Sequence, residues 1–211
     1  MAKTLVTYFS ATGTTKDVAC RLARVADSNL FAIVPANPYT SADLNWCDKQ
    51  SRSTLEAADP SCRPAITSRV EHIEDYDIIF LGFPIWWYVA PAIVNTFLES
   101  YDLTGKTVVL FATSGGSGMG KTASVLRASA PGAKIVDGGI LNNASNTSLE
   151  KFAARYLSRD KGANGEHVAP SRRRAVVAVL PYDHALIDGE IPYTESHMTA
   201  SCHNDRYDTK D

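Results

Sequence analysis

The sequence predicts an α/β protein with a doubly wound, five-stranded parallel sheet, strand order 2-1-3-4-5, in a three-layer α/β/α arrangement. Two observations support this fold class. Short apolar runs rich in β-branched residues alternate with segments whose apolar residues recur at helical spacing. The runs also lack polar alternation, which is typical of strands covered on both faces, as in parallel sheets.

The N-terminal half is predicted to contain two strands and two helices. In chain order they are a strand at 3–8, a helix at 14–26, a strand at 30–34 and a helix at 44–58. Both strands are short apolar runs, and Pro35 ends the second. Val18, Leu22 and Val25 are spaced four and three apart, so they share one face of the first helix. The second helix is expected within a polar region, 37–70, that contains several prolines.

The C-terminal half of the fold repeats the alternation. In chain order we expect a strand at 77–82, a helix at 91–101, a strand at 106–112, a helix at 119–129, a strand at 134–136 and a helix at 148–157. Pro91 suits the first turn of its helix. Pro131 follows the helix that ends at 129, and Thr147 or Ser148 is expected to cap the closing helix.

Composition excludes several classes of protein. The formal net charge of -2 argues against general nucleic-acid binding. No apolar stretch approaches the roughly 20 residues of a membrane span, and no signal peptide is recognised. The four cysteines show no C-x-x-C spacing, which suits a reducing compartment better than a disulfide scaffold. We therefore expect a cytoplasmic protein without nucleic-acid or membrane partners.

Charge and histidine content change near residue 158. Residues 1–158 hold 14 basic and 14 acidic residues, whereas the remainder holds 7 and 9 and four of the five histidines. We predict one domain at 1–158 and a C-terminal extension at 159–211 that is partly disordered. The spacing of His184, His197, Cys202 and His203 matches no strong metal motif, so no metal site is predicted.

Three loops follow the first, third and fourth predicted strands, where the carboxyl ends of a doubly wound sheet bind ligands. The first, which we call the hydroxyl loop, spans residues 10–15 and opens a helix. Its members are Ser10, Ala11, Thr12, Gly13, Thr14 and Thr15. A helix N-terminus offers unpaired N–H groups and partial positive charge, and four hydroxyls add donors. This combination predicts a phosphate site that needs no Lys or Arg, although an ordinary helix cap is the simpler alternative.

The second loop, the aromatic loop at 83–88, carries Trp86, Trp87 and Tyr88 directly after a buried strand. Three adjacent aromatic residues cannot all point into one core, so some are expected to meet a flat apolar ligand, or else to cover the sheet edge or form an interface. The third loop, the glycine loop at 113–118, gives a planar ring edge close access to the backbone.

A competing motif begins in the glycine loop. Residues 115–122, the P-loop-like segment, fit G-x-x-x-x-G-K-[ST] letter for letter, with Lys121 and Thr122 at the last two positions. A nucleotide hydrolase normally begins its domain with the P-loop strand, whereas here three strands precede the strand at 106–112 that leads into this segment. Residues 175–183 resemble a magnesium-binding strand, which keeps a P-loop nucleotide-binding protein as the lesser alternative.

Taken together, the stretches 8–15, 82–87 and 112–118 resemble the flavodoxin family, in particular its short bacterial-type domains, over about residues 1–158. The resemblance implies non-covalently bound FMN, with the ribityl phosphate on the hydroxyl loop and the isoalloxazine ring between the other two loops. By that resemblance the FMN-binding residues are Ser10, Thr12, Gly13, Thr14, Thr15, Pro84, Ile85, Trp86, Trp87, Thr113, Ser114, Gly115, Gly116 and Gly118.

Members of this family are either electron carriers or flavin oxidoreductases that use NAD(P)H or quinones. Carriers are strongly acidic and often have a glycine beside the flavin, whereas residues 1–158 are neutral by count and 85–89 contain no glycine. We therefore expect two-electron hydride transfer, with a redox protein or small molecule as partner and no catalytic side chain. A pure flavodoxin carrier and a module that keeps the fold without flavin remain alternatives.

Overall fold

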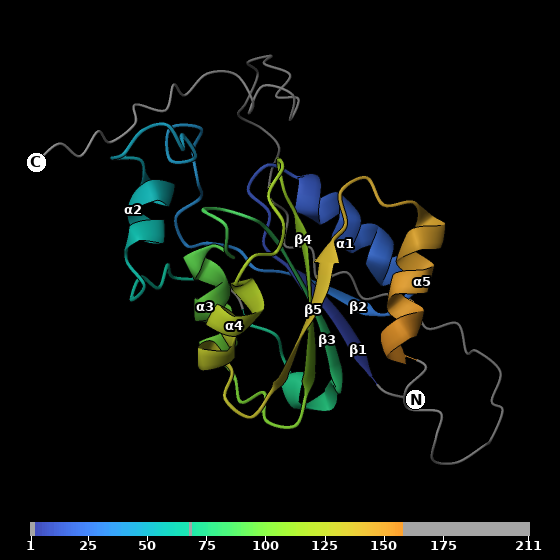
Figure 1. The fold of residues 1–211 in the computed structure, drawn as a ribbon. Coiled ribbons are helices and arrows are strands. Elements are labelled where there is room, and N and C mark those ends of the chain that lie inside the picture. The colour runs from blue at the N-terminus through green and yellow to red at the C-terminus, as the bar shows by residue number, and fades with distance from the viewer. Residues whose placement is uncertain (1–2, 68, 158–211) are drawn as a thin grey trace, which may run out of the picture.

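The computed structural model describes residues 3–67 and 69–157. Its centre is a five-stranded parallel sheet in the order β2-β1-β3-β4-β5, which confirms the predicted fold class (Figure 1). In chain order the strands are β1 (Thr4–Tyr8), β2 (Asn29–Ala32), β3 (Ile78–Pro84), β4 (Thr107–Thr113) and β5 (Lys134–Ile140). The switch point of the order therefore lies between β1 and β3, where the hydroxyl and aromatic loops begin.

Helices cover both faces of the sheet. They are α1 (Thr14–Val25), α2 (Arg52–Ala58), α3 (Ala92–Glu99), α4 (Thr122–Leu126) and α5 (Asn146–Leu157), with short 3-10 turns at Ile73–Asp75 and Arg127–Ser129. In Figure 1, α1 and α5 cover one face and α3 and α4 the other, whereas α2 lies beyond α3. None of the helices in the described residues is long and apolar enough to cross a membrane.

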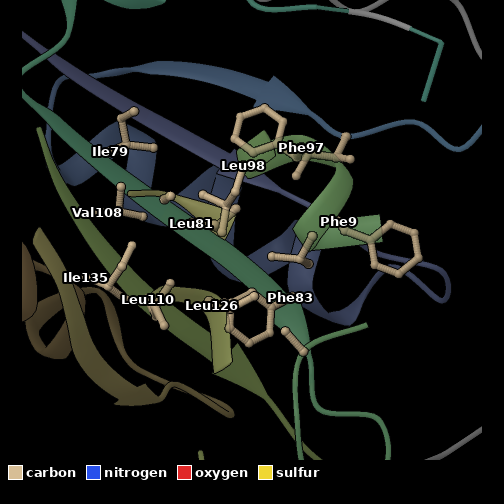
Figure 2. Close-up of a cluster of buried hydrophobic side chains, with 14 of the residues drawn as sticks. Phe9, Ile79, Leu81, Phe83, Phe97, Leu98, Val108, Leu110, Leu126 and Ile135 are labelled. Atoms are coloured by element: carbon tan, nitrogen blue, oxygen red, sulfur yellow. The ribbon is translucent and has the colours of Figure 1, made fainter. Parts of the chain in front are cut away.

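The alternation of strand residues divides the core into two layers. In β4, Val108 and Leu110 join the cluster that contains Phe97 of α3, whereas Val109 and Phe111 join the cluster beneath α1 and α5. Figure 2 shows the α3 side, where side chains of β3 and β4 meet those of α3. Each large side chain buried here stabilises the fold by about 1.5–3 kcal/mol, and the two layers together fix the sheet that carries the loops.

Two helices begin well after their predicted starts. The helix expected at 44–58 begins only at Arg52, because residues 41–44 form turns and the Ser51 side chain caps the helix by accepting a hydrogen bond from Thr54 N at 3.4 Å. The helix expected at 119–129 begins at Thr122, because Gly120 has a φ of +53°, outside the right-handed helical region.

The last strand is longer than predicted. β5 continues through Gly138 and Gly139 to Ile140, across an irregularity in its pairing with β4. A Cβ at Gly138 would lie 2.3 Å from the Leu110 carbonyl oxygen, so glycine permits this β-bulge instead of ending the strand. The cap of α5 is Ser145, not Thr147 or Ser148, since Ser148 N donates to Ser145 Oγ at 3.2 Å.

The predicted extension at 159–211, with its histidines, lies outside the described residues. The boundary at residue 158 therefore stays a prediction.

Candidate functional site

The three loops predicted to form the site meet at the carboxyl edge of the sheet, and they are joined directly or through residues that flank them. The Thr15 and Thr113 hydroxyls are 2.8 Å apart and join the hydroxyl loop to the glycine loop. Phe9, which precedes the hydroxyl loop, packs edge-on against Trp86 at 5.5 Å between ring centroids. The backbone at Gly120 approaches the Tyr88 carbonyl so closely that a Cβ there would lie 2.7 Å from its oxygen.

The hydroxyl loop leaves the start of α1 without a side-chain cap. Its N-cap residue is Gly13, which has a φ of +96° and no side chain to accept a hydrogen bond from the first turn. Ser10 Oγ instead accepts from Gly13 N at 3.1 Å, which folds the loop back on itself. Because Thr12 and Gly13 are exposed, the first-turn N–H groups and the helix dipole are available to an anion from solvent.

The aromatic loop ends in a tight turn, residues 86–89, which we call the aromatic turn. Trp86 and Val89 exchange two backbone hydrogen bonds of 3.0 Å, and the residues between them, Trp87 and Tyr88, have φ values of +51° and +65°. Two central residues with positive φ define a type I′ turn, which usually contains Asn or Gly. A residue with a Cβ costs about 1–2 kcal/mol in this conformation, so the turn stores backbone strain.

Only part of the aromatic turn is exposed. Trp87 is 40% exposed and Tyr88 73% exposed, whereas Trp86 is half-buried in a cluster of three rings. In that cluster Trp86 lies 5.2 Å from Tyr39 and 5.5 Å from Phe9, both edge-on. Trp86 therefore acts first as an anchor of the turn, and its two neighbours offer free aromatic surface.

Tyr39 is a site residue that sequence analysis missed. Its hydroxyl donates to Glu56 Oε2 at 2.7 Å, and the Arg52 guanidinium lies over its ring at 4.0 Å. Arg52 also donates to Glu56 Oε1 at 2.6 Å, so α2 holds the ring from two sides. Burial, together with the hydrogen bond to Glu56, raises the pKa of Tyr39 far above its usual value. Tyr39 is thus a neutral side chain, held in place by α2, that packs against Trp86. The only sequence signal for this role is an aromatic residue within a polar region.

The glycine loop is fixed by hydrogen bonds of its own. Asn142, in the segment after β5, accepts from Ser114 N at 2.9 Å and donates back to Ser114 O. Ser114 Oγ lies 3.0 Å from Ser117 Oγ and accepts from Gly116 N. Asn142 was missed because the strand before it was predicted to end at 136, short of this edge. Gly115, Gly116 and Gly118 remain exposed.

The P-loop-like segment does not present its last two residues as a nucleotide site requires. The Thr122 side chain, which would bind magnesium, is fully buried, and its hydroxyl has no hydrogen-bond partner in the described structure. Lys121 is exposed, but it precedes a helix of only five residues. The geometry therefore disfavours the nucleotide hydrolase that the motif alone would suggest.

The predicted site residues fall into two groups. Most of the fourteen line the edge with exposed or half-buried positions, including Ser10, Thr12, Gly13 and Trp87. Ser114, which is hydrogen bonded to Asn142, is instead buried. Thr15 and Thr113 are also buried, beneath the loops, and are hydrogen bonded to each other. Their hydroxyls hold the loops together under the surface that a ligand would touch.

Comparisons with known proteins identify the relatives of this chain. The flavodoxin family model matches residues 3–156. A protein from Bacteroides eggerthii described as a flavoprotein is 47% identical, with a TM-score of 0.69, and the match covers 74% of this chain and 99% of that one. A flavoprotein structure from Bacteroides uniformis is 45% identical, with a TM-score of 0.67 and coverage of 72% and 97%.

A more distant structure contains a cofactor. A flavoprotein from Lactobacillus acidophilus in complex with FMN is 23% identical, with a TM-score of 0.50, and the match covers 66% of this chain and 92% of that one. At this identity the likeness supports the fold alone. No functionally curated protein matches the chain.

Proposed function

Because the chain belongs to the flavodoxin family, we propose that it binds FMN non-covalently between its three loops and transfers electrons or hydride through it. The observation that carries this proposal is that the hydroxyl, aromatic and glycine loops, joined directly or through flanking residues, meet at the switch-point edge beside an uncapped helix N-terminus. When bound, FMN supplies the redox chemistry, and the protein supplies position and electrostatics.

The hydroxyl loop would hold the ribityl phosphate. The first-turn N–H groups of α1 lack a side-chain cap, and the hydroxyls of Ser10, Thr12 and Thr14 lie at or near the surface around them. A phosphate monoester accepts such hydrogen bonds and is attracted by the helix dipole. Thr15 would support the site from below through its bond to Thr113.

The aromatic turn and the glycine loop would hold the ring. The exposed side chains of Trp87 and Tyr88 offer flat apolar surface, whereas Trp86 is occupied by Phe9 and Tyr39. Across the edge, Gly115 and Gly116 leave the backbone open to the polar rim of the ring. Pro84, Ile85, Ser114 and Gly118 complete the predicted lining.

We favour an NAD(P)H- or quinone-type oxidoreductase over a pure electron carrier. The predicted domain is neutral by count, so it lacks the acidic surface that steers a carrier to basic redox proteins. No glycine stands between Ile85 and Val89, and the turn there is closed by two hydrogen bonds. Both features favour two-electron transfer at a fixed site. A cytoplasmic location is part of this proposal and is based on the cysteine spacing alone.

Spectroscopy and binding test the cofactor. Purified protein should be yellow, should release FMN on denaturation, and should bind FMN much more tightly than riboflavin because of the phosphate site. Isothermal titration with FMN, riboflavin and ATP with magnesium separates the alternatives. Protein that binds ATP with magnesium and rejects FMN would contradict the proposal.

Kinetic assays separate an enzyme from a carrier. With FMN bound, steady-state turnover of NADPH with a quinone is expected. A redox titration should proceed as one two-electron step. Two well-separated one-electron steps, together with no NADPH turnover, would favour the pure flavodoxin carrier instead.

A further inference from the structure

We infer that Gly120 is a positioning residue that sets the place of the aromatic turn, an inference that rests on the proposed FMN site. Gly120 lies against the backbone of Tyr88, where an added Cβ would sit 2.7 Å from the carbonyl oxygen. Real Cβ atoms are essentially never this close to another heavy atom, and the neighbouring atom belongs to the backbone. Any side chain at position 120 must therefore displace something.

The aromatic turn depends on outside support. Trp87 and Tyr88 both have positive φ, a conformation that persists for such residues only where the surroundings impose it. The Tyr88 side chain is 73% exposed and contributes little packing of its own. Apart from its two closing hydrogen bonds and the anchor at Trp86, the turn is supported where its Tyr88 carbonyl meets Gly120.

Gly120 itself has little freedom to retreat. Met119 on one side is buried in the α3-side cluster, and Thr122 on the other side is fully buried. Thr122 N also donates to Met119 O at 3.1 Å, which closes the backbone around Gly120. A side chain at 120 would thus push the exposed turn outward, rather than move the segment that is packed into the core.

This placement explains the P-loop-like pattern without a nucleotide. The second glycine of the motif is needed for a positive φ of +53° and for clearance of the Tyr88 carbonyl. The final threonine of the motif is a buried residue at the start of α4. The motif letters therefore arise from packing between two loops of one flavin site.

The test compares two substitutions at Gly120 with a matched control. Gly120→Ala adds a Cβ and a positive-φ penalty, whereas Gly120→Asn adds the Cβ in a residue type that tolerates positive φ. Gly105→Ala is the control, because Gly105 has a φ of +78°, nothing within 4 Å of an added Cβ, and a place between α3 and β4 outside the loops of the site. It carries the backbone penalty without the collision.

Both Gly120 variants are expected to bind FMN and riboflavin about tenfold more weakly than the parent. Their near-ultraviolet circular dichroism without FMN should also change, since Trp87 and Tyr88 move. Gly105→Ala should match the parent in flavin affinity and in circular dichroism, even if it unfolds at a lower urea concentration. If Gly120→Ala does not fold, Gly120→Asn carries the comparison.

The outcomes distinguish this inference from the proposed function. Parent-like FMN affinity and dichroism in both Gly120 variants would overturn the positioning role while leaving the FMN site standing. Rescue by Gly120→Asn would also overturn it, because backbone strain and not the collision would then be the cause. If the parent itself binds no FMN, the proposed function fails, and the dichroism of the variants still decides whether Gly120 holds the turn.

Discussion

The hydroxyl loop and the glycine loop have similar compositions but different structural states. Both follow a buried parallel strand and are rich in small and hydroxyl residues. The hydroxyl loop opens a twelve-residue helix without a side-chain cap. The glycine loop is tied to Asn142 and leads, through Gly120, to a helix of five residues. A phosphate site therefore depends on free N–H groups at a helix start, and matching motif letters are not sufficient.

The largest expected effect tests the phosphate at the hydroxyl loop. Thr12→Glu places a negative charge at an exposed position beside the first turn of α1 and should weaken FMN binding on the order of 100-fold, about 2.7 kcal/mol. Thr12→Gln, the neutral control, should weaken it far less. Riboflavin affinity, measured by the same fluorescence titration, should barely change, and an equal loss for both ligands would show that the phosphate lies elsewhere.

The next prediction breaks the link between the two loops. Thr15→Val or Thr113→Val removes one hydroxyl of a buried pair and should lower the free energy of unfolding by about 1–3 kcal/mol. The double substitution leaves no unpaired hydroxyl and should lose less than the sum of the two. Urea denaturation of the parent, the two single variants and the double variant gives the coupling free energy between the two hydroxyls. Strictly additive losses would mean that the hydrogen bond contributes nothing to stability.

A smaller effect concerns the strained aromatic turn. Tyr88→Gly relieves a positive-φ residue and should raise the free energy of unfolding by up to about 1 kcal/mol. FMN affinity should fall in the same variant, because the exposed ring is lost. Thermal denaturation without FMN tests the expected gain in stability, and a binding titration tests the expected loss of FMN affinity. A variant that loses stability would show that the turn is unstrained.

The smallest expected effect is at the lysine of the P-loop-like segment. Lys121→Ala removes an exposed charge away from the proposed phosphate and should leave FMN affinity within about twofold. A loss on the order of 100-fold, measured in the same titration, would move the phosphate to the glycine loop and reverse the comparison.

The fold was predictable because its signals are local. Residues 108–111 of β4 alternate between the two core layers, and Val18 and Leu22 share the buried face of α1. Local signals failed at glycines, because a glycine can end a helix or strand or can lie within one. The strand predicted at 134–136 continues through Gly138 and Gly139, which form a bulge inside it, and the helix predicted from 119 begins only after Gly120.

The candidate site was predictable only in outline. The strand order brought the three loops to one edge, as the sequence predicted. Tyr39 and Asn142 were missed, because each acts through a partner far along the chain. Tyr39 packs on Trp86, and Asn142 holds Ser114. No periodicity in the sequence reports such pairs.

By itself, the sequence determined the parallel sheet, the position of its loops and the resemblance that points to FMN. These follow from periodicity and residue type within short windows. Only the tertiary structure decided which loop offers free N–H groups, that Thr122 is buried, and that Gly120 supports Tyr88. These depend on contacts between residues far apart in the chain, such as Thr15 and Thr113, which meet only when the sheet and both helical layers are assembled.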